Sequence, residues 1–279
     1  MASKSSQDFR AQARQIADKH AKSDARRRKW LMGGIGALVL VVLVVIGLVI
    51  WQVRSQQIPD AGPVPGSSNQ YGGIVMTADG IEKDTSDTTE VNVKDAPPAP
   101  ETPPSEPDAE GIVDPGTASE TGDPVQIVIW QDFDCVHCAD MEKEYGDEIA
   151  ELVKNGDATV EYRTVNFLDN GTQYSSRAAN AYYAVAEQVG TEQALEFQKE
   201  IFTHQGSGGL DDQEIIDIAA KHGADVTDAV KDGQWRTMVN YTSALAQGNG
   251  VAGTPTVIID GKQWDQKQGI KETVEAARN

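Results

Sequence analysis

The sequence predicts a mixed α/β domain that follows one transmembrane helix and a Pro-rich linker. Three observations lead to this fold class. Residues 31–53 form an apolar run without a charged side chain, and ten of the 12 prolines lie between Pro59 and Pro115. From residue 123 onward, short runs of β-branched residues alternate with stretches of helical periodicity. We therefore expect a membrane anchor, a spacer and one α/β domain, in that order.

The apolar run at residues 31–53 is long enough to cross a membrane. As an α-helix it would extend about 35 Å, and the hydrocarbon core of a bilayer is about 30 Å thick. Trp30 and Trp51 stand near its ends, where interfacial aromatic residues are common. The run is longer than the apolar part of a signal peptide and lacks a small-residue cleavage site after it. We expect an uncleaved single-pass anchor.

The distribution of charge predicts the orientation of this anchor. The tail at residues 1–30 carries a net charge of +6, although the whole chain carries −19. Basic residues flank the cytoplasmic side of membrane helices, so the N-terminus should be cytoplasmic and the chain after Arg54 extracytoplasmic. Everything after the anchor is strongly acidic, which excludes a nucleic-acid-binding function because such binding depends on neutralising phosphates.

Residues 54–122 are expected to be a mostly disordered spacer. The Pro-rich stretch from Ala96 to Pro107 cannot bury a core and favours an extended chain. Within the spacer, residues 71–81 read YGGIVMTADGI, and their apolar run predicts a strand that belongs to the folded domain. The domain itself should span residues 123–279.

The elements of the domain follow from their periodicity. The run VQIVIW is typical of a buried strand, and Asp260–Gly261 is a favoured hairpin dipeptide. The sequence shows no internal repeat. In chain order we expect a strand at 125–130, a helix at 139–155, a strand at 158–167, a helical block at about 172–248, a hairpin at 254–264 and a helix at 270–278.

The only two cysteines form one motif, Cys135-Val136-His137-Cys138. A disulfide that closes so small a loop stabilises the fold by only about 2 kcal/mol, so a structural staple is a poor explanation. The motif follows a strand and opens a helix, where unpaired N–H groups and the helix dipole favour a thiolate. We expect Cys135 to be the reactive thiolate and Cys138 to resolve a mixed disulfide.

The neighbours of Cys135 act in opposite directions. A protonated His137 ring would stabilise the thiolate and make the disulfide a stronger oxidant, whereas the charge of Asp134 would raise the pKa of Cys135. Asp134 could also cap the helix. The sequence leaves open which effect dominates.

The cysteines have two other interpretations. They could be incidental core thiols, although the polar context and the strand–helix position argue against this. They could bind a metal together with a histidine, but no second ligand pair has useful spacing. We expect no metal and no cofactor. The remaining histidines are His20, His204 and His222.

A second constellation, Gly253-Thr254-Pro255-Thr256, precedes the apolar run VIID. A proline at the start of a strand is ordinary by itself. Together with the upstream cysteines, however, the chain from about Tyr71 resembles the DsbA-like thioredoxin domains of bacterial cell envelopes. The resemblance rests on DFDCVHC at 132–138 and on ALAQGNGVAGTPTVIIDG at 244–261. YGGIV resembles the added N-terminal strand of actinobacterial-type members.

The resemblance implies a thioredoxin fold with an inserted helical domain, and it implies roles for several residues. Pro255 should be cis and face the cysteines, and the backbone of Thr254 should pair with the substrate chain beside Val136. Asp132 matches a common acid of the closer relatives and is a candidate for proton transfer. Two departures matter: many members have proline at the position of Val136, and many thioredoxins have a buried acid where this chain has Ile129.

These observations predict an extracytoplasmic oxidoreductase that introduces disulfide bonds into exported proteins. Its partners would be unfolded exported proteins with free thiols and, as the resemblance implies, a quinone-linked membrane oxidase that reoxidises the pair. One alternative is a disulfide reductase or isomerase on the same fold, which usually needs a reduced pair and a dimerisation module. Another is a non-catalytic membrane-anchored scaffold or chaperone.

Overall fold

The computed structural model describes residues 42–46, 58–83, 86–100, 122–205 and 208–278. The chain divides into two units, Met1–Gln57 and Ile58–Asn279. In the first unit, residues 42–46 are helical, and the rest of the predicted membrane span at 31–53 lies outside the described residues. None of the helices in the described ranges has the length and apolar character needed to traverse a bilayer.

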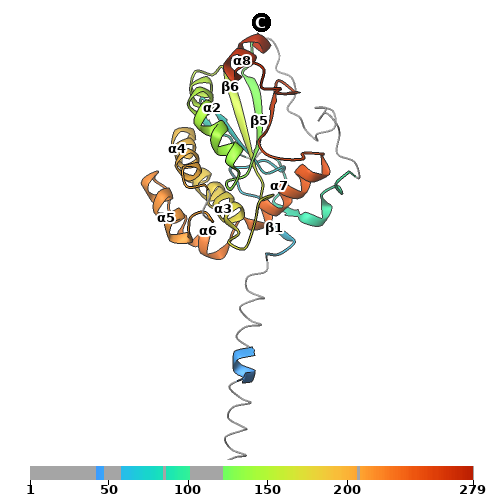
Figure 1. Cartoon of the computed structure of the whole chain (residues 1–279), viewed down its shortest axis with the longest axis vertical. Helices are drawn as coiled ribbons and strands as arrows, with labels where there is room; N and C mark the ends of the chain where they lie inside the picture. Colours follow the sequence, from blue (N-terminus) through green and yellow to red (C-terminus); the bar gives the residue numbers. More distant parts are fainter. Residues whose placement is uncertain (1–41, 47–57, 84–85, 101–121, 206–207, 279) are drawn as a thin grey trace, which may run out of the picture. The chain divides into compact units, whose positions relative to one another are not determined.

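A six-stranded mixed sheet is the centre of the second unit (Figure 1). Its strand order is β3-β2-β6-β5-β7-β8. Strands β5 and β6 are parallel, and every other neighbouring pair is antiparallel. The strands are β2 (Gly73–Thr77), β3 (Gly80–Ile81), β5 (Val125–Gln131), β6 (Ala158–Thr164), β7 (Thr256–Ile259) and β8 (Lys262–Gln263).

The parallel pair β5 and β6 positions the cysteine motif. These strands are joined by helix α2 (Val136–Lys154), and such a crossover packs back onto the sheet it leaves. Both strands are almost fully buried, which explains their continuous runs of apolar residues. Because parallel strands end at the same edge of a sheet, the loop after β5 and the loop after β6 lie next to each other.

Five helices form the block inserted between β6 and β7. Figure 1 shows α3–α6 gathered on one side of the strands, with α7 on the other side in this view. The block packs around aromatic side chains, among them Phe133, Tyr182 and Phe197. The helices are α3 (Tyr174–Ala186), α4 (Thr191–Phe202), α5 (Asp212–Lys221), α6 (Thr227–Asp232) and α7 (Arg236–Gly248); α8 (Ile270–Arg278) closes the domain.

The prediction of a mostly disordered spacer at residues 54–122 is wrong for residues 58–70 and 90–95, which pack on the domain, whereas the strand predicted within residues 71–81 is confirmed. Strand β1 (Ala61–Pro63) pairs with β4 (Glu90–Asn92), and a 3₁₀ turn, η1 (Val93–Asp95), follows. These elements contact α7, and Gly62 lies against Thr237. Strands of only three residues are too short to produce a periodic pattern, so the high proline and glycine content of this segment led to the prediction of a spacer.

The hairpin of β2 and β3 lies within residues 71–81, where the sequence predicts a strand, and it forms one edge of the sheet. Ile74 and Met76 of β2 are completely buried in the main core. Next to them, a buried ion pair on β6 joins Arg163 Nε to Glu161 Oε1 at 2.7 Å. Asn69 Nδ2 donates to the same oxygen at 2.8 Å, so the chain before β2 is tied to the sheet by a polar contact as well as by apolar burial.

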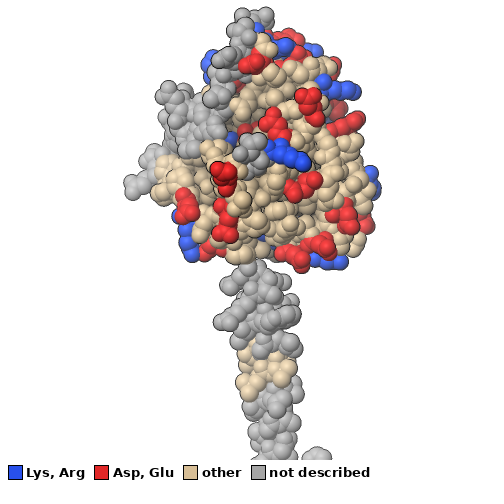
Figure 2. Space-filling view, turned by 180° about the vertical axis from the view of Figure 1, so that it is seen from behind, with Lys and Arg blue, Asp and Glu red and all other residues tan. Residues whose placement is uncertain are grey.

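Charged side chains are interspersed over the surface of the domain. On the face seen in Figure 2, acidic and basic residues lie scattered among uncharged ones, and no continuous basic stripe is visible there. Nucleic-acid recognition would require such a stripe.

Candidate active site

Cys135 and Cys138 lie at the start of α2, directly after the loop that leaves β5. Cys135 occupies the N-cap position, and its backbone N–H donates to Asp132 O at 3.0 Å. Both thiols are free in this structure and buried, with 4% of Cys135 and 0% of Cys138 exposed. Val136 and His137, between them, are exposed. The prediction that the motif opens a helix is confirmed.

The loop before β7 brings Thr254 and Pro255 to the cysteines. The peptide bond between these two residues is cis, as the resemblance implies. Cys135 Sγ lies 3.3 Å from the Thr254 carbonyl oxygen, to which the protonated form of the thiol donates. The sheet makes this contact between residues distant in sequence, because β5 and β7 are neighbours.

The two thiols have opposite acidities. The pKa of Cys135 is lowered to about 5, first by a hydrogen bond from the Cys138 thiol and then by the Thr254 hydroxyl and two backbone N–H groups, against the effect of burial. The pKa of Cys138 is raised by burial and by the negative sulfur of Cys135. At neutral pH the pair therefore holds one thiolate, at Cys135, and one thiol, at Cys138.

Two polar residues next to Cys135, Asp134 and His137, were expected to influence its thiolate. His137 stabilises the Cys135 thiolate through its backbone N–H, and its exposed side chain lines a groove described below. Asp134 does not cap α2: Cys135 holds that position, and the Asp134 carboxylate accepts from Asn170 Nδ2 at 3.1 Å. The prediction that Asp134 caps the helix is wrong because α2 begins one residue later than that role requires, which places Cys135 at the N-cap.

Asp132 is completely buried beneath the motif. Its Oδ1 accepts from Asp134 N at 2.9 Å and from Ser175 Oγ at 2.5 Å, and its Oδ2 accepts from Leu168 N at 2.9 Å. Burial raises its pKa to about 6 despite these donors, and the Cys135 charge adds to the rise. The carboxyl group can therefore gain or lose a proton near neutral pH and responds to the state of the reactive thiol.

Sequence reasoning missed two of the three partners of Asp132, Ser175 and Leu168, which come from outside the cysteine loop. Leu168 follows β6, and the parallel pairing of β5 with β6 places it beside the cysteine loop. A strand–helix–strand order usually gives parallel neighbouring strands, so this order was the signal that could have pointed to the loop after β6. Ser175, in the first turn of α3, had no motif to mark it.

An apolar hollow of about 580 Å³ adjoins Cys135. Its rim includes Val136 and Leu168, which are 50% and 45% exposed. Among the described residues of Ile58–Asn279, these are the two large hydrophobic side chains that are exposed. The other lining residues are Asp134, His137, Phe167, Gln205, Gln247, Val251, Ala252, Gly253 and Thr254.

On the other side of His137 and Thr254 lies a second groove, also of about 580 Å³. We call it the acidic groove; its lining residues are His137, Asp140, Met141, Glu144, Tyr145, Thr254, Pro255, Trp264 and Gln266. Two open hollows thus flank the reactive thiol.

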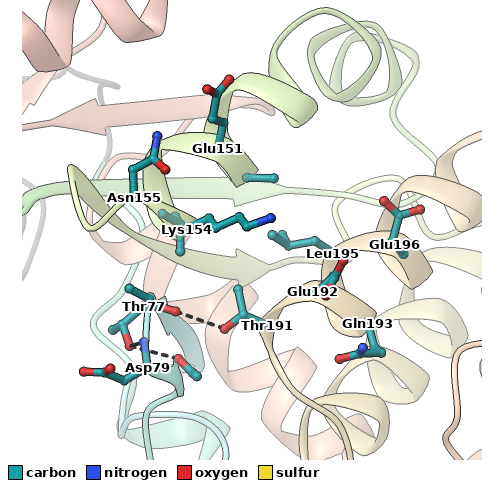
Figure 3. Close-up of a pocket in the computed structure, with 14 residues that line it drawn as sticks. Thr77, Asp79, Glu151, Lys154, Asn155, Thr191, Glu192, Gln193, Leu195 and Glu196 are labelled. Atoms are coloured by element: carbon teal, nitrogen blue, oxygen red, sulfur yellow. Dashed lines mark hydrogen bonds between the residues drawn. The ribbon is translucent and has the colours of Figure 1, made fainter.

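A third hollow, of about 690 Å³, lies at the opposite end of α2 and is shown in Figure 3. Lys154 and Glu151 come from α2, and Thr191 Oγ1 donates to Thr77 O at 3.3 Å across its floor. It contains no cysteine and is separate from the thiol chemistry. The described residues also include no cluster of three His, Cys, Asp or Glu side chains suited to a metal ion.

Solved structures similar to this chain include thiol–disulfide proteins of actinobacteria. A disulfide bond oxidoreductase, DsbG, from Mycobacterium tuberculosis is 25% identical, with 61% of this chain and 97% of that chain covered and a TM-score of 0.50. DsbA from the same organism is 26% identical, with 58% and 92% covered and a TM-score of 0.48. The oxidoreductase MdbA from Corynebacterium diphtheriae is 29% identical, with 56% and 84% covered and a TM-score of 0.47.

A comparison with curated proteins gives no match. The sequence model of the family described as thioredoxin matches residues 120–277, which include both cysteines, the cis-proline loop and the inserted helices. Since this match covers more than half of the sequence, the chain belongs to the thioredoxin family.

Proposed function

We propose that this thiol–disulfide oxidoreductase introduces disulfide bonds into exported proteins through Cys135 and Cys138. The observation that carries the proposal is the pair of opposite acidities, with the pKa of Cys135 lowered to about 5 and that of Cys138 raised. A stabilised thiolate favours the reduced form of the pair, which makes its disulfide a strong oxidant. The direction of electron flow is then from the client protein to the enzyme.

The exchange proceeds through a mixed disulfide. A client thiolate attacks Cys135 Sγ of the Cys135–Cys138 disulfide, and Cys138 leaves as a thiolate that takes up a proton. A second client thiolate then attacks the client sulfur of the mixed disulfide, and Cys135 leaves as a stable thiolate. The client loses two electrons and gains a disulfide, and the enzyme pair gains the two electrons.

The client chain binds across the motif. The exposed Val136 and Leu168 and the apolar hollow between them suit apolar side chains that an unfolded protein still exposes. The backbone of Thr254, beside Pro255, offers hydrogen bonds to an extended client strand, a mode that tolerates many sequences. Residues Val136, Thr254 and Pro255 therefore bind the client around the reacting sulfur.

Asp132 serves as the proton carrier in this scheme. Its carboxyl group is buried next to the motif, and its pKa of about 6 means that a fraction of it holds a proton near neutral pH, which it can pass to the Cys138 thiolate as that sulfur leaves. Its three hydrogen bonds hold the group in place during the exchange.

The apolar run at residues 31–53 anchors the enzyme with its N-terminus in the cytoplasm and its catalytic domain outside. The basic tail before the run supports this orientation. The electrons leave the reduced pair to the disulfide of a quinone-linked membrane oxidase, which restores the Cys135–Cys138 disulfide.

The test is a trapping experiment in cells. Cys138→Ala leaves Cys135 able to form a mixed disulfide but removes the second thiol of the pair. We expect the variant to accumulate as disulfide-linked complexes with several exported proteins, detected on non-reducing gels and lost on reduction. Cys135→Ser is the matched control and should form none. Absence of complexes with Cys138→Ala would contradict client oxidation, and a normal phenotype of Cys135→Ser would favour a non-catalytic scaffold.

A further inference from the structure

The acidic groove begins at the reactive motif and runs along α2. One wall consists of His137, Asp140, Met141, Glu144 and Tyr145, which recur at helical spacing and so share one face of α2. The opposite wall contains Pro255 and Trp264 from the region of β7 and β8. His137 and Thr254 line both this groove and the apolar hollow, so a chain that crosses Cys135 can enter both.

The charge in the groove is of one sign. Asp140 and Glu144 are its carboxylates, and neither pairs with a Lys or Arg side chain in the part of the chain that the structure describes. The nearby Lys267 binds Asp265 at 2.8 Å. Glu144 accepts a hydrogen bond from the Tyr145 hydroxyl and so raises the pKa of Tyr145. Two like charges at positions i and i+4 of a helix disfavour each other, and a bound cation would relieve this repulsion.

The aromatic side chains complement this charge. Tyr145 and Trp264 meet edge to face, with 5.2 Å between ring centroids, and both line the groove. Aromatic rings beside carboxylates suit the long apolar stem of Lys or Arg together with its charged end. The same walls would disfavour an acidic client side chain.

We propose that the acidic groove makes this enzyme prefer client segments that carry Lys or Arg close to the reacting cysteine. The inference rests on the proposed function, because it specifies the client of that same site. Along α2, Asp140 and Glu144 lie about 7.5 and 13.5 Å beyond Cys135 at about 1.5 Å per residue. An extended peptide advances about 3.3 Å per residue, so the basic residue should stand about two to four positions from the client cysteine.

The experiment measures thiol–disulfide exchange between the oxidised full-length chain and synthetic peptides with one cysteine. The peptides are identical except for Arg, Gln or Glu three positions before or three positions after the cysteine. Mixed-disulfide formation is followed by rapid quenching and mass spectrometry, at low and at high ionic strength. Because Cys135 and Cys138 are the only cysteines of the chain, every adduct reports on this pair.

We expect Arg to speed the reaction roughly three- to fivefold over Gln at one of the two positions, as an exposed charge pair allows, and Glu to slow it. High salt should reduce the difference. The double variant Asp140→Asn, Glu144→Gln should bring the Arg/Gln ratio close to one. The matched control, Glu151→Gln with Glu192→Gln, removes the same charge at the remote hollow of Figure 3 and should keep the preference.

Two results would overturn the inference. One is equal rates for the Arg, Gln and Glu peptides at both positions. The other is an Arg preference that both double variants lose to the same extent, since that preference would come from the acidity of the whole chain. A failure of the proposed function has a different signature, in which no peptide forms a mixed disulfide with the chain at all.

Discussion

At the residue scale, the acidity of Cys135 comes from the donors that surround its sulfur. The Cys138 thiol contributes most, followed by the Thr254 hydroxyl and the backbone N–H groups of Cys138 and His137. Burial opposes them, so each donor compensates for lost hydration of the thiolate. The reactive thiol therefore depends on two parts of the chain, the start of α2 and the cis-proline loop, meeting at one sulfur.

Thr254→Val tests this balance. Loss of the hydroxyl removes a hydrogen bond to a charged group, so the pKa of Cys135 should rise by about one unit. The measurement is the ultraviolet absorbance of the thiolate as a function of pH. Thr159→Val, which removes a hydroxyl on β6 outside the motif, should leave the titration unchanged. An unaltered pKa in Thr254→Val would show that the backbone of this loop, without the hydroxyl, is what matters.

Asp132→Asn tests the coupling between the buried carboxyl and the thiolate. The charge of Cys135 raises the pKa of Asp132, and the carboxylate must disfavour the thiolate equally. The substitution should therefore lower the pKa of Cys135 and flatten the rate of exchange across pH 6. Glu142→Gln, another buried carboxyl on α2, serves as the control and should leave the thiol titration in place. A higher pKa of Cys135 in Asp132→Asn would refute the coupling.

At the element scale, a buried polar chain connects α2, α4 and β5. Gln198 Nε2 donates to Glu142 Oε2 at 2.9 Å, and Gln131 Nε2 donates to Gln198 Oε1 at 2.6 Å. The Glu142 carboxyl lies over Gly146, where a Cβ would collide with it. Burial raises its pKa to about 7, so the helices pack around a group that prefers its neutral form.

Glu142→Gln should stabilise the domain at high pH. A carboxyl with a folded pKa of about 7 and an ordinary value of 4.5 binds a proton on folding, so its contribution is lost as the pH rises from 4.5 through 7. At about 1.4 kcal/mol per pKa unit, the variant should gain roughly 3 kcal/mol over the native chain at pH 8 and little at pH 4. Urea unfolding at the two pH values measures this. An equal effect at both would contradict an ionising Glu142.

Substitutions in β2 test whether the hairpin of β2 and β3 belongs to the folded core. Ile74 is fully buried and Val75, which faces the other side of the strand, is partly exposed. Ile74→Ala should cost about 2–5 kcal/mol in the free energy of unfolding, and Val75→Ala less than half of that. Urea unfolding of the two full-length variants gives the comparison. If both substitutions cost equally little, the hairpin does not contribute to the core.

At the scale of the whole molecule, the sequence predicted the parts of the site that carry local patterns. The spacing of Cys135 and Cys138 and their position between a strand and a helix identify them as candidate redox residues. Thr254 and Pro255 are identified by the apolar strand that follows them. The inserted helices were expected at about 172–248, and they span Tyr174–Gly248. In each case the chemistry depends on residues that are neighbours in sequence.

The parts of the fold and of the site that the sequence did not predict depend on contacts that only the folded chain makes. The three-residue strands β1 and β4 are stabilised by each other and by α7, so their Pro- and Gly-rich sequence alone favours a linker. The anchors of Asp132 come from the loop after β6 and from α3, 36 and 43 residues away. The apolar hollow likewise arises where α2, the loop after β6 and the cis-proline loop converge, and the acidic groove arises where α2 faces the cis-proline loop and the residues after β8.

The reduction potential of the Cys135–Cys138 pair is the most direct test of the central claim that this enzyme is an oxidant. It is measured on the full-length chain in equilibrium with mixtures of reduced and oxidised glutathione, and the redox state of the two cysteines is read by thiol alkylation and mass spectrometry. A Cys135 pKa of about 5 predicts a potential well above the value of about −270 mV for thioredoxin, toward that of about −120 mV for DsbA. A potential at or below the thioredoxin value would contradict the account and assign the pair to a reductase.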